Sequence, residues 1–66
     1  MNKKDIEQFT NKECKMYFDG MLSGKRIMED VIIHRVIGKY TEYILKDNDD
    51  NLRFLPNKNI VSLEEI

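Results

Sequence analysis

Apolar and polar residues alternate along several short segments of the chain, and this pattern predicts a mainly β protein. The residues from Glu13 to Phe18 alternate between apolar and polar types, which indicates a strand with one buried face. Val31 to Tyr40 is rich in β-branched residues, and apolar residues occupy both odd and even positions. This stretch is therefore expected to be a strand that is buried on both sides or sharply bent, with Gly38 marking the bend.

Three further short strands are predicted towards the C-terminus, over Thr41–Lys46, Leu52–Leu55 and Asn59–Leu63. Asp47–Asn51 consists of Asp and Asn residues and is predicted to be a turn, as are Asp19-Gly20 and Ser23-Gly24. Pro56 should end the strand before it, because proline cannot donate a hydrogen bond to a sheet. The segment Met21–Met28 is compatible with either a hairpin arm or a long loop.

The N-terminal segment predicts a short helix from Asn2 to about Lys12. Asn2 is a good N-cap residue, and Asp5 follows it three residues later. Ile6 and Phe9 lie on one side of such a helix and could cover the end of a small barrel. The expected architecture is one domain over residues 1–66, with the helix in 1–12 and a five-stranded, strongly bent SH3-like barrel in 13–63.

Composition narrows the classes of function. With 11 Lys and Arg against 12 Asp and Glu, the net charge of −1 argues against a general nucleic-acid coat protein. No apolar run approaches the roughly 20 residues of a membrane span, and no signal-peptide core follows the N-terminus, so a cytoplasmic protein is expected. The single cysteine, Cys14, forms no internal disulfide. Because so small a core lacks a stabilising disulfide or an obvious structural metal, a homo-oligomer is expected.

One turn resembles a calcium loop in part. Asp47, Asp49 and Asn51 match the first three ligand positions of an EF-hand. Leu52 occupies the position that requires glycine, and Lys58 the position that requires a bidentate glutamate. A solvated turn without calcium is therefore expected, and no metal or other cofactor is predicted.

The chain contains cysteine, histidine and acidic residues, which can support catalysis, but their spacing matches no catalytic motif. Cys14 alternates with apolar residues and is expected in the core, and His34 is expected to be a partly buried structural histidine. The neighbouring pairs Glu29-Asp30 and Glu64-Glu65 should point to opposite strand faces, so neither forms an obvious acid–base pair. The expectation is a protein that is not an enzyme.

Two tyrosines are candidates for a binding role. Lys39, Tyr40 and Tyr43 place aromatic rings beside a lysine, an arrangement in which rings stack on bases and the ammonium meets phosphate. The alternative is that one or both rings fill a core that lacks tryptophan.

Three stretches resemble the Sm-like family of small β-barrels. Phe9–Gly20 is similar to its first strand and ends in Tyr-Phe-Asp-Gly, Val36–Asp47 is similar to its bent second-to-third strand, and Leu52–Leu63 is similar to its closing strands. In this last stretch Pro56-Asn57 replaces the family's Arg-Gly. The resemblance implies a homo-oligomeric ring built by pairing strands of neighbouring barrels. It also implies a single-stranded RNA or small-nucleotide ligand at the subunit junctions, with Lys39, Tyr40, Tyr43, Asn57, Lys58 and Asn59 lining the site.

A second hypothesis belongs to another class of function. Small barrels also act as protein-binding modules or inhibitors. Here the acidic residues Asp47–Asp50, Glu64 and Glu65 could meet a basic groove on a partner protein, although such charges usually serve solubility.

Overall fold

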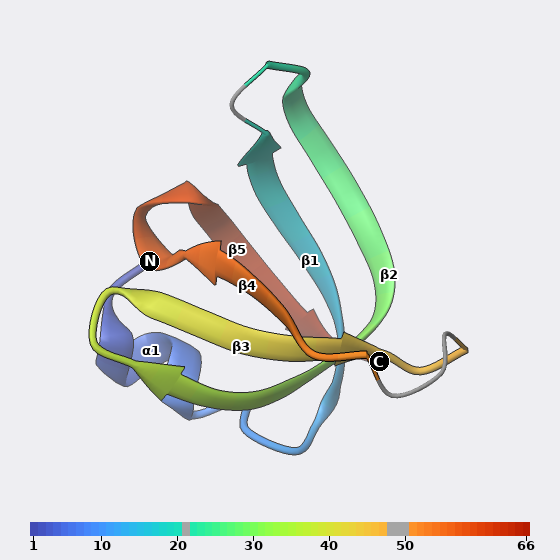
Figure 1. The fold of residues 1–66 in the computed structure, drawn as a ribbon. Coiled ribbons are helices and arrows are strands. Elements are labelled where there is room, and N and C mark those ends of the chain that lie inside the picture. The colour runs from blue at the N-terminus through green and yellow to red at the C-terminus, as the bar shows by residue number, and fades with distance from the viewer. Residues whose placement is uncertain (21, 48–50) are drawn as a thin grey trace.

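The computed structural model describes residues 1–20, 22–47 and 51–66, and this part of the chain is mainly β. One short helix is followed by five strands in a single antiparallel sheet with the order β4-β3-β2-β1-β5 (Figure 1). The elements are helix α1 (Lys3–Glu7), strands β1 (Glu13–Gly20), β2 (Gly24–Ile37), β3 (Tyr40–Leu45) and β4 (Arg53–Pro56), the 3-10 helix η1 (Asn57–Asn59) and strand β5 (Ile60–Glu65). The mainly β prediction with one short N-terminal helix is confirmed.

Helix α1 begins as predicted and ends earlier. The Asn2 side chain accepts a hydrogen bond from the backbone N–H of Asp5 at 2.9 Å, which is the predicted N-cap. The prediction that the helix continues to about residue 12 is wrong, because the chain leaves the helix to pair with the sheet. Asn11 adopts a positive φ of 62°, and its N–H donates to the carbonyl oxygen of Ile33 at 2.8 Å.

Of the segment Met21–Met28, for which a hairpin arm and a long loop were the alternatives, residues 22–28 belong to a hairpin arm, and Met21 lies outside the described residues. Strands β1 and β2 remain paired up to Gly20 and Gly24 and form an arm that extends away from the rest of the sheet (Figure 1). The prediction that Asp19-Gly20 is a turn is therefore wrong, because both residues belong to β1. Gly24, at a positive φ of 73°, is the first residue of β2.

Strand β2 is sharply bent, but not at the predicted residue. Its pairing with β3 shifts register between Ile33 and Arg35, and Asp30 adopts a positive φ of 57° beside a second register shift against β1. Gly38, at a φ of 58°, lies instead in the turn between β2 and β3. The strand bends at its bulges, which the alternation pattern did not reveal.

The core lies on one face of the bent sheet, with α1 packed against it. Cys14 and Tyr43 both belong to the core, and Tyr43 is only 5% exposed. The placement of Cys14 confirms its predicted core position. The buried apolar residues are Ile6, Cys14, Met16, Val31, Ile33, Tyr43, Ile60 and Leu63.

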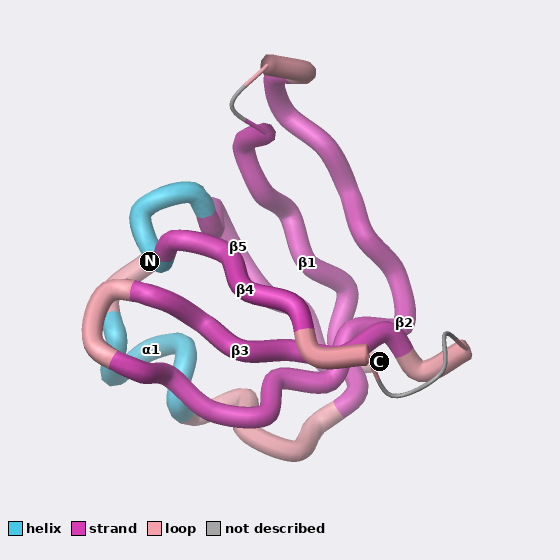
Figure 2. Tube along the Cα trace, viewed as in Figure 1, coloured by secondary structure: helices cyan, strands magenta, loops and turns pink. Residues whose placement is uncertain are grey.

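The sheet has two edges, β4 and β5, which η1 connects directly (Figure 2). Within the described ranges, β4 pairs only with β3 and β5 pairs only with β1, so the sheet is not closed. Closure into a barrel of SH3-like or Sm-like type stays a prediction. Among the described residues, no helix combines the length and hydrophobicity needed to cross a lipid bilayer.

Candidate functional site

Most of the predicted binding residues lie around one cavity of about 820 Å³. The cavity lies beside the β2–β3 turn, η1 and the N-terminal residues. It brings together the predicted residues Lys39, Tyr40, Asn57, Lys58 and Asn59, which are far apart in the sequence. Its other lining residues are Met1, Asn2, Lys3, Asp19, Gly38 and Pro56.

Asn57 joins the two chain segments that form the cavity. Its backbone N–H donates to the carbonyl oxygen of Lys39 at 2.9 Å, and its side-chain amide donates to the carbonyl oxygen of Gly38 at 3.2 Å. Its side-chain oxygen accepts from the Thr41 hydroxyl at 2.6 Å in a buried hydrogen bond. The buried Asn57 side chain is thus bonded at both ends to the protein, and its position indicates that it orients the turn.

Hydrogen bonds from Met1 and Asn59 to backbone carbonyl oxygens hold the N-terminus and η1 in place at the cavity. The Met1 amine donates to the carbonyl oxygens of Asn57 at 3.1 Å and Ile60 at 2.6 Å. The Asn59 side-chain amide donates to the carbonyl oxygen of Asp19 at 3.0 Å, which holds η1 against the end of β1. These contacts fix the cavity rim without using the lysine side chains.

The cavity combines positive charge with an aromatic surface. Lys3, Lys39 and Lys58 contribute three ammonium groups, against one carboxylate from Asp19. Within the part of the chain that the structure describes, none of the three lysines forms an ion pair, so their charge is available to an anion. Tyr40 is 52% exposed and offers a ring face for stacking.

Tyr43 was the remaining predicted site residue, and it does not line the cavity. It lies on the core face of β3, two strand positions from the buried Thr41. Burial raises the pKa of its hydroxyl, while the charge of Arg53 opposes that shift. Tyr43 is therefore a core residue, whereas the exposed ring of Tyr40 stays a candidate for binding.

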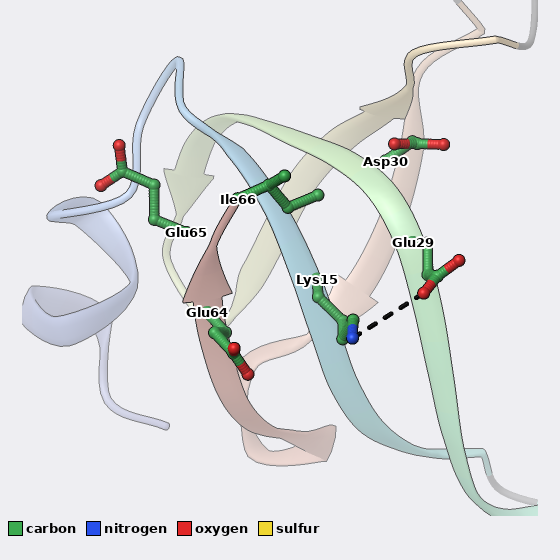
Figure 3. A pocket seen from close by; sticks show the side chains of 6 residues that line it. All are labelled: Lys15, Glu29, Asp30, Glu64, Glu65 and Ile66. Atoms are coloured by element: carbon green, nitrogen blue, oxygen red, sulfur yellow. Dashed lines mark ion pairs between the residues drawn. The ribbon is translucent and has the colours of Figure 1, made fainter.

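A second, acidic hollow of about 380 Å³ lies between β1, β2 and the C-terminus (Figure 3). Lys15 Nζ lies 3.8 Å from Glu29 Oε1 and is the one cation of the lining. Desolvation raises the pKa of the Asp30 carboxyl, and the neighbouring carboxylates of Asp47 and Glu13 raise it further. The lining residues are Lys15, Glu29, Asp30, Glu64, Glu65 and Ile66.

The neighbouring pairs Glu29-Asp30 and Glu64-Glu65 all contribute to the lining of this hollow. Glu64 and Glu65 nevertheless point to opposite faces of β5 as predicted, because Glu65 pairs with the core residue Cys14 and Glu64 pairs with Lys15 (Figure 3). At the first pair, the bulge in β2 interrupts the strict alternation of side chains. The predicted acidic turn at 47–51 cannot be assessed in the same way, because residues 48–50 lie outside the described residues.

Sequence reasoning missed Glu42, a buried carboxylate on β3. The residue is 2% exposed, and its Oε2 accepts a hydrogen bond from Arg35 Nε at 3.2 Å. His34 Nε2 lies 3.9 Å from Oε1, and the His34 side chain is 54% exposed rather than partly buried as predicted. No alternation signal distinguishes Glu42 from the solvent-facing acids of other strands.

The described residues contain no group of three or more His, Cys, Asp or Glu side chains arranged to hold a metal ion. The predicted calcium-free turn at 47–51 lies partly outside those residues. Comparisons of the chain with known protein families, with characterised proteins and with solved structures found no match. The function must therefore be argued from the geometry of the chain itself.

Proposed function

We propose that the protein is a non-enzymatic binding protein, a homo-oligomeric ring of Sm-like barrels that binds single-stranded RNA or small nucleotides at its subunit junctions. The observation that carries the proposal is a single cavity lined both by the exposed ring of Tyr40 and by three lysines that form no ion pair within the described chain. Lysine attracts phosphate, and an aromatic face stacks on any base.

The charge distribution favours a short or small ligand. The chain as a whole has a net charge of −1, so attraction to phosphate arises only where the lysines gather. A local patch of this kind supports contact with a few phosphates, whereas an extended duplex needs positive charge along a longer surface. Affinity for random duplex DNA should accordingly be low.

The open edges of the sheet support the oligomeric part of the proposal. Among the described residues, β4 and β5 each pair with a single neighbouring strand, and each carries an exposed apolar residue, Phe54 and Val61 respectively. Pairing β4 of one subunit with β5 of the next would cover both edges. Pro56, the last residue of β4, lines the cavity, so such a junction would border the binding site.

The test is fluorescence anisotropy with short A-rich and U-rich RNAs and a panel of small and cyclic nucleotides, at two salt concentrations. Tyr40→Ala should weaken binding by about 1–3 kcal/mol per stacked base. Lys58→Ala should weaken it less and flatten the salt dependence. Lys25→Ala is the matched control, because Lys25 is an exposed lysine on the β1–β2 arm outside the cavity.

If both Tyr40→Ala and Lys58→Ala still assemble and bind the ligand as the wild type does, the ligand binds to another surface. Absence of binding to every ligand at low salt would reject the proposal.

The acidic hollow favours a second candidate, a protein-binding module that docks on a basic groove. Four carboxylates around one lysine present a negative surface that suits a cationic partner. In a pull-down from the native host, a partner held by this surface should be lost when Glu29 and Glu65 are both changed to Gln. Retention of the partner by the double variant would reject this candidate.

A further inference from the structure

The outer face of the sheet holds a buried carboxylate with an unused acceptor. Glu42 lies on β3 opposite Arg35 on β2 and Phe54 on β4. Arg35 satisfies Oε2, but within the described ranges no donor reaches Oε1, which is inaccessible to solvent. A buried acceptor without a partner costs free energy, so a group that donates to Oε1 would be bound favourably.

Exposed apolar side chains surround this carboxylate. The register places Arg35, Ile37, Tyr40, Glu42 and Phe54 on the same face of β2, β3 and β4. Ile37, Tyr40 and Phe54 are each about half exposed although they are large and apolar. The face therefore offers flat apolar contact next to a donor–acceptor pair formed by Arg35 and Glu42.

This face is continuous with the lysine cavity. Tyr40 is two positions before Glu42 on β3 and is also part of the cavity wall. Its partner on β4, Pro56, lines the cavity too. A nucleotide whose phosphate meets Lys39 and Lys58 could therefore place its base along Tyr40 towards Glu42.

We infer that the base recognised at this site is guanine, read on its Watson–Crick edge by Glu42 and Arg35; the inference rests on the proposed nucleotide binding. Guanine presents two adjacent N–H donors, N1–H and the exocyclic amine, beside the O6 acceptor. Glu42 has free acceptor capacity at Oε1 and a further lone pair on Oε2. Arg35, which is exposed, keeps N–H groups that can donate to O6.

The other bases match this pair less well. Adenine and cytosine each offer an amine donor next to a ring-nitrogen acceptor, and that acceptor would face the Glu42 carboxylate. Uracil offers one N–H between two carbonyl oxygens, both of which would be repelled by the carboxylate. Only guanine places two donors side by side, which is the arrangement that a carboxylate accepts.

Because Oε1 is inaccessible to solvent, a base reaches it only when a neighbouring side chain moves. One such neighbour is His34, whose Nε2 lies 3.9 Å from Oε1 and whose half-exposed side chain has room to rotate towards solvent. The base then occupies the place next to Oε1. His34→Ala should therefore preserve guanine binding, whereas a change at Glu42 should not.

The experiment is a calorimetric titration of the assembled protein with GMP, IMP and AMP. GMP should bind about tenfold more tightly than AMP, because a good bidentate contact discriminates by about that factor. IMP, which lacks the exocyclic amine, should fall between them. Glu42→Gln should abolish the preference for GMP, because an amide presents one donor beside one acceptor and no longer matches the two adjacent donors of guanine. Glu64→Gln is the matched control on another surface.

The outcomes separate this inference from the proposed function. Equal binding of GMP, IMP and AMP by the wild-type protein overturns the guanine assignment and leaves nucleotide binding intact. A guanine preference that survives Glu42→Gln also overturns it. Absence of binding for all three nucleotides overturns the inference, and the RNA titrations then decide the proposed function. The wild-type series needs no variant, so it remains decisive if Glu42→Gln does not fold.

Discussion

At the scale of single residues, the candidate site depends on a buried polar contact between two chain segments. The hydroxyl of Thr41 on β3 donates to the side chain of Asn57 on η1, and Asn57 in turn donates to the carbonyl of Gly38. These bonds fix the turn that carries Lys39 relative to η1, which carries Lys58. Buried polar groups act in this way only when all their hydrogen bonds are made.

Replacing Thr41 with Val should therefore destabilise the protein. Valine preserves the shape of threonine, but it leaves the buried Asn57 oxygen without its 2.6 Å donor. The expected loss is about 1–3 kcal/mol in the free energy of unfolding, measured by urea denaturation. Thr41→Ser, which keeps the hydroxyl, should lose less. Equal stability of Thr41→Val and the wild type would show that this hydrogen bond does not support the site.

Asp30 gives a prediction about pH. Desolvation, followed by repulsion from Asp47 and Glu13, raises the pKa of its carboxyl above the ordinary value of 3.8. Folding then favours the protonated form, so stability is highest below the unfolded-state pKa and falls as pH rises through the folded-state pKa. Asp30→Asn should be more stable than the wild type at neutral pH, and the difference should shrink as the pH is lowered through the folded-state pKa and become constant below the unfolded-state value of about 4.

Thermal melts of both proteins across this pH range provide the measurement. Asparagine also tolerates the positive φ at this position, so a constant gain is compatible with backbone effects. Only the pH-dependent part tests the electrostatic explanation. A difference between the two proteins that does not change with pH would contradict it.

At the scale of elements, the β2–β3 turn depends on its glycine. Gly38 is the first of the two residues between Ile37 and Tyr40 and adopts a positive φ of 58°. Hairpins of type II′ require a positive φ at this position and favour glycine there. An added Cβ would meet no atom within 4 Å, so the cost of a substitution comes from the backbone conformation alone.

Gly38→Ala should cost about 1–2 kcal/mol of stability, and Gly38→Asn should cost less because asparagine accepts positive φ more readily. Chemical denaturation of the two variants gives this comparison directly. Equal stability of the alanine and asparagine variants, or a stabilising alanine, would show that the turn adopts a different conformation.

The elements also show which features of the fold the sequence could predict. Alternation located β1, and the cap at Asn2 located the start of α1. The bulges in β2 and the early end of α1 depend on hydrogen bonds between segments distant in sequence, such as Asn11 to Ile33. Local patterns do not contain those contacts.

The candidate site likewise contains residues that the sequence predicted and residues that it did not. Lys39, Tyr40 and the residues of η1 were predicted because an aromatic–lysine cluster and the family resemblance pointed to them. Lys3 joins them only through folding, since it comes from the other end of the chain. Glu42 was missed because a charged residue in a strand normally faces solvent, and its burial between the paired strands β2 and β4 becomes visible only in the folded sheet.

At the scale of the whole molecule, the two open edges predict assembly. Light scattering behind a sizing column should give several times the 7.9 kDa mass of the chain. Val61→Lys on β5 should reduce that mass, because a charged residue at an exposed edge opposes strand pairing. Leu22→Lys is the matched control, since Leu22 is fully exposed beyond the end of β1 and away from both edges.

A monomer at tens of micromolar, where weak assemblies still form by mass action, would contradict the ring and leave a single binding module.

The central claim is that nucleotides bind in the cavity beside Tyr40, and backbone amide NMR of the untagged, isotope-labelled protein titrated with GMP tests it most directly. The predicted result is saturable shift changes concentrated at Lys39, Tyr40 and the residues of η1, with the acidic hollow around Glu64 unaffected. Shift changes centred on the acidic hollow, or no changes at millimolar GMP, would contradict the claim.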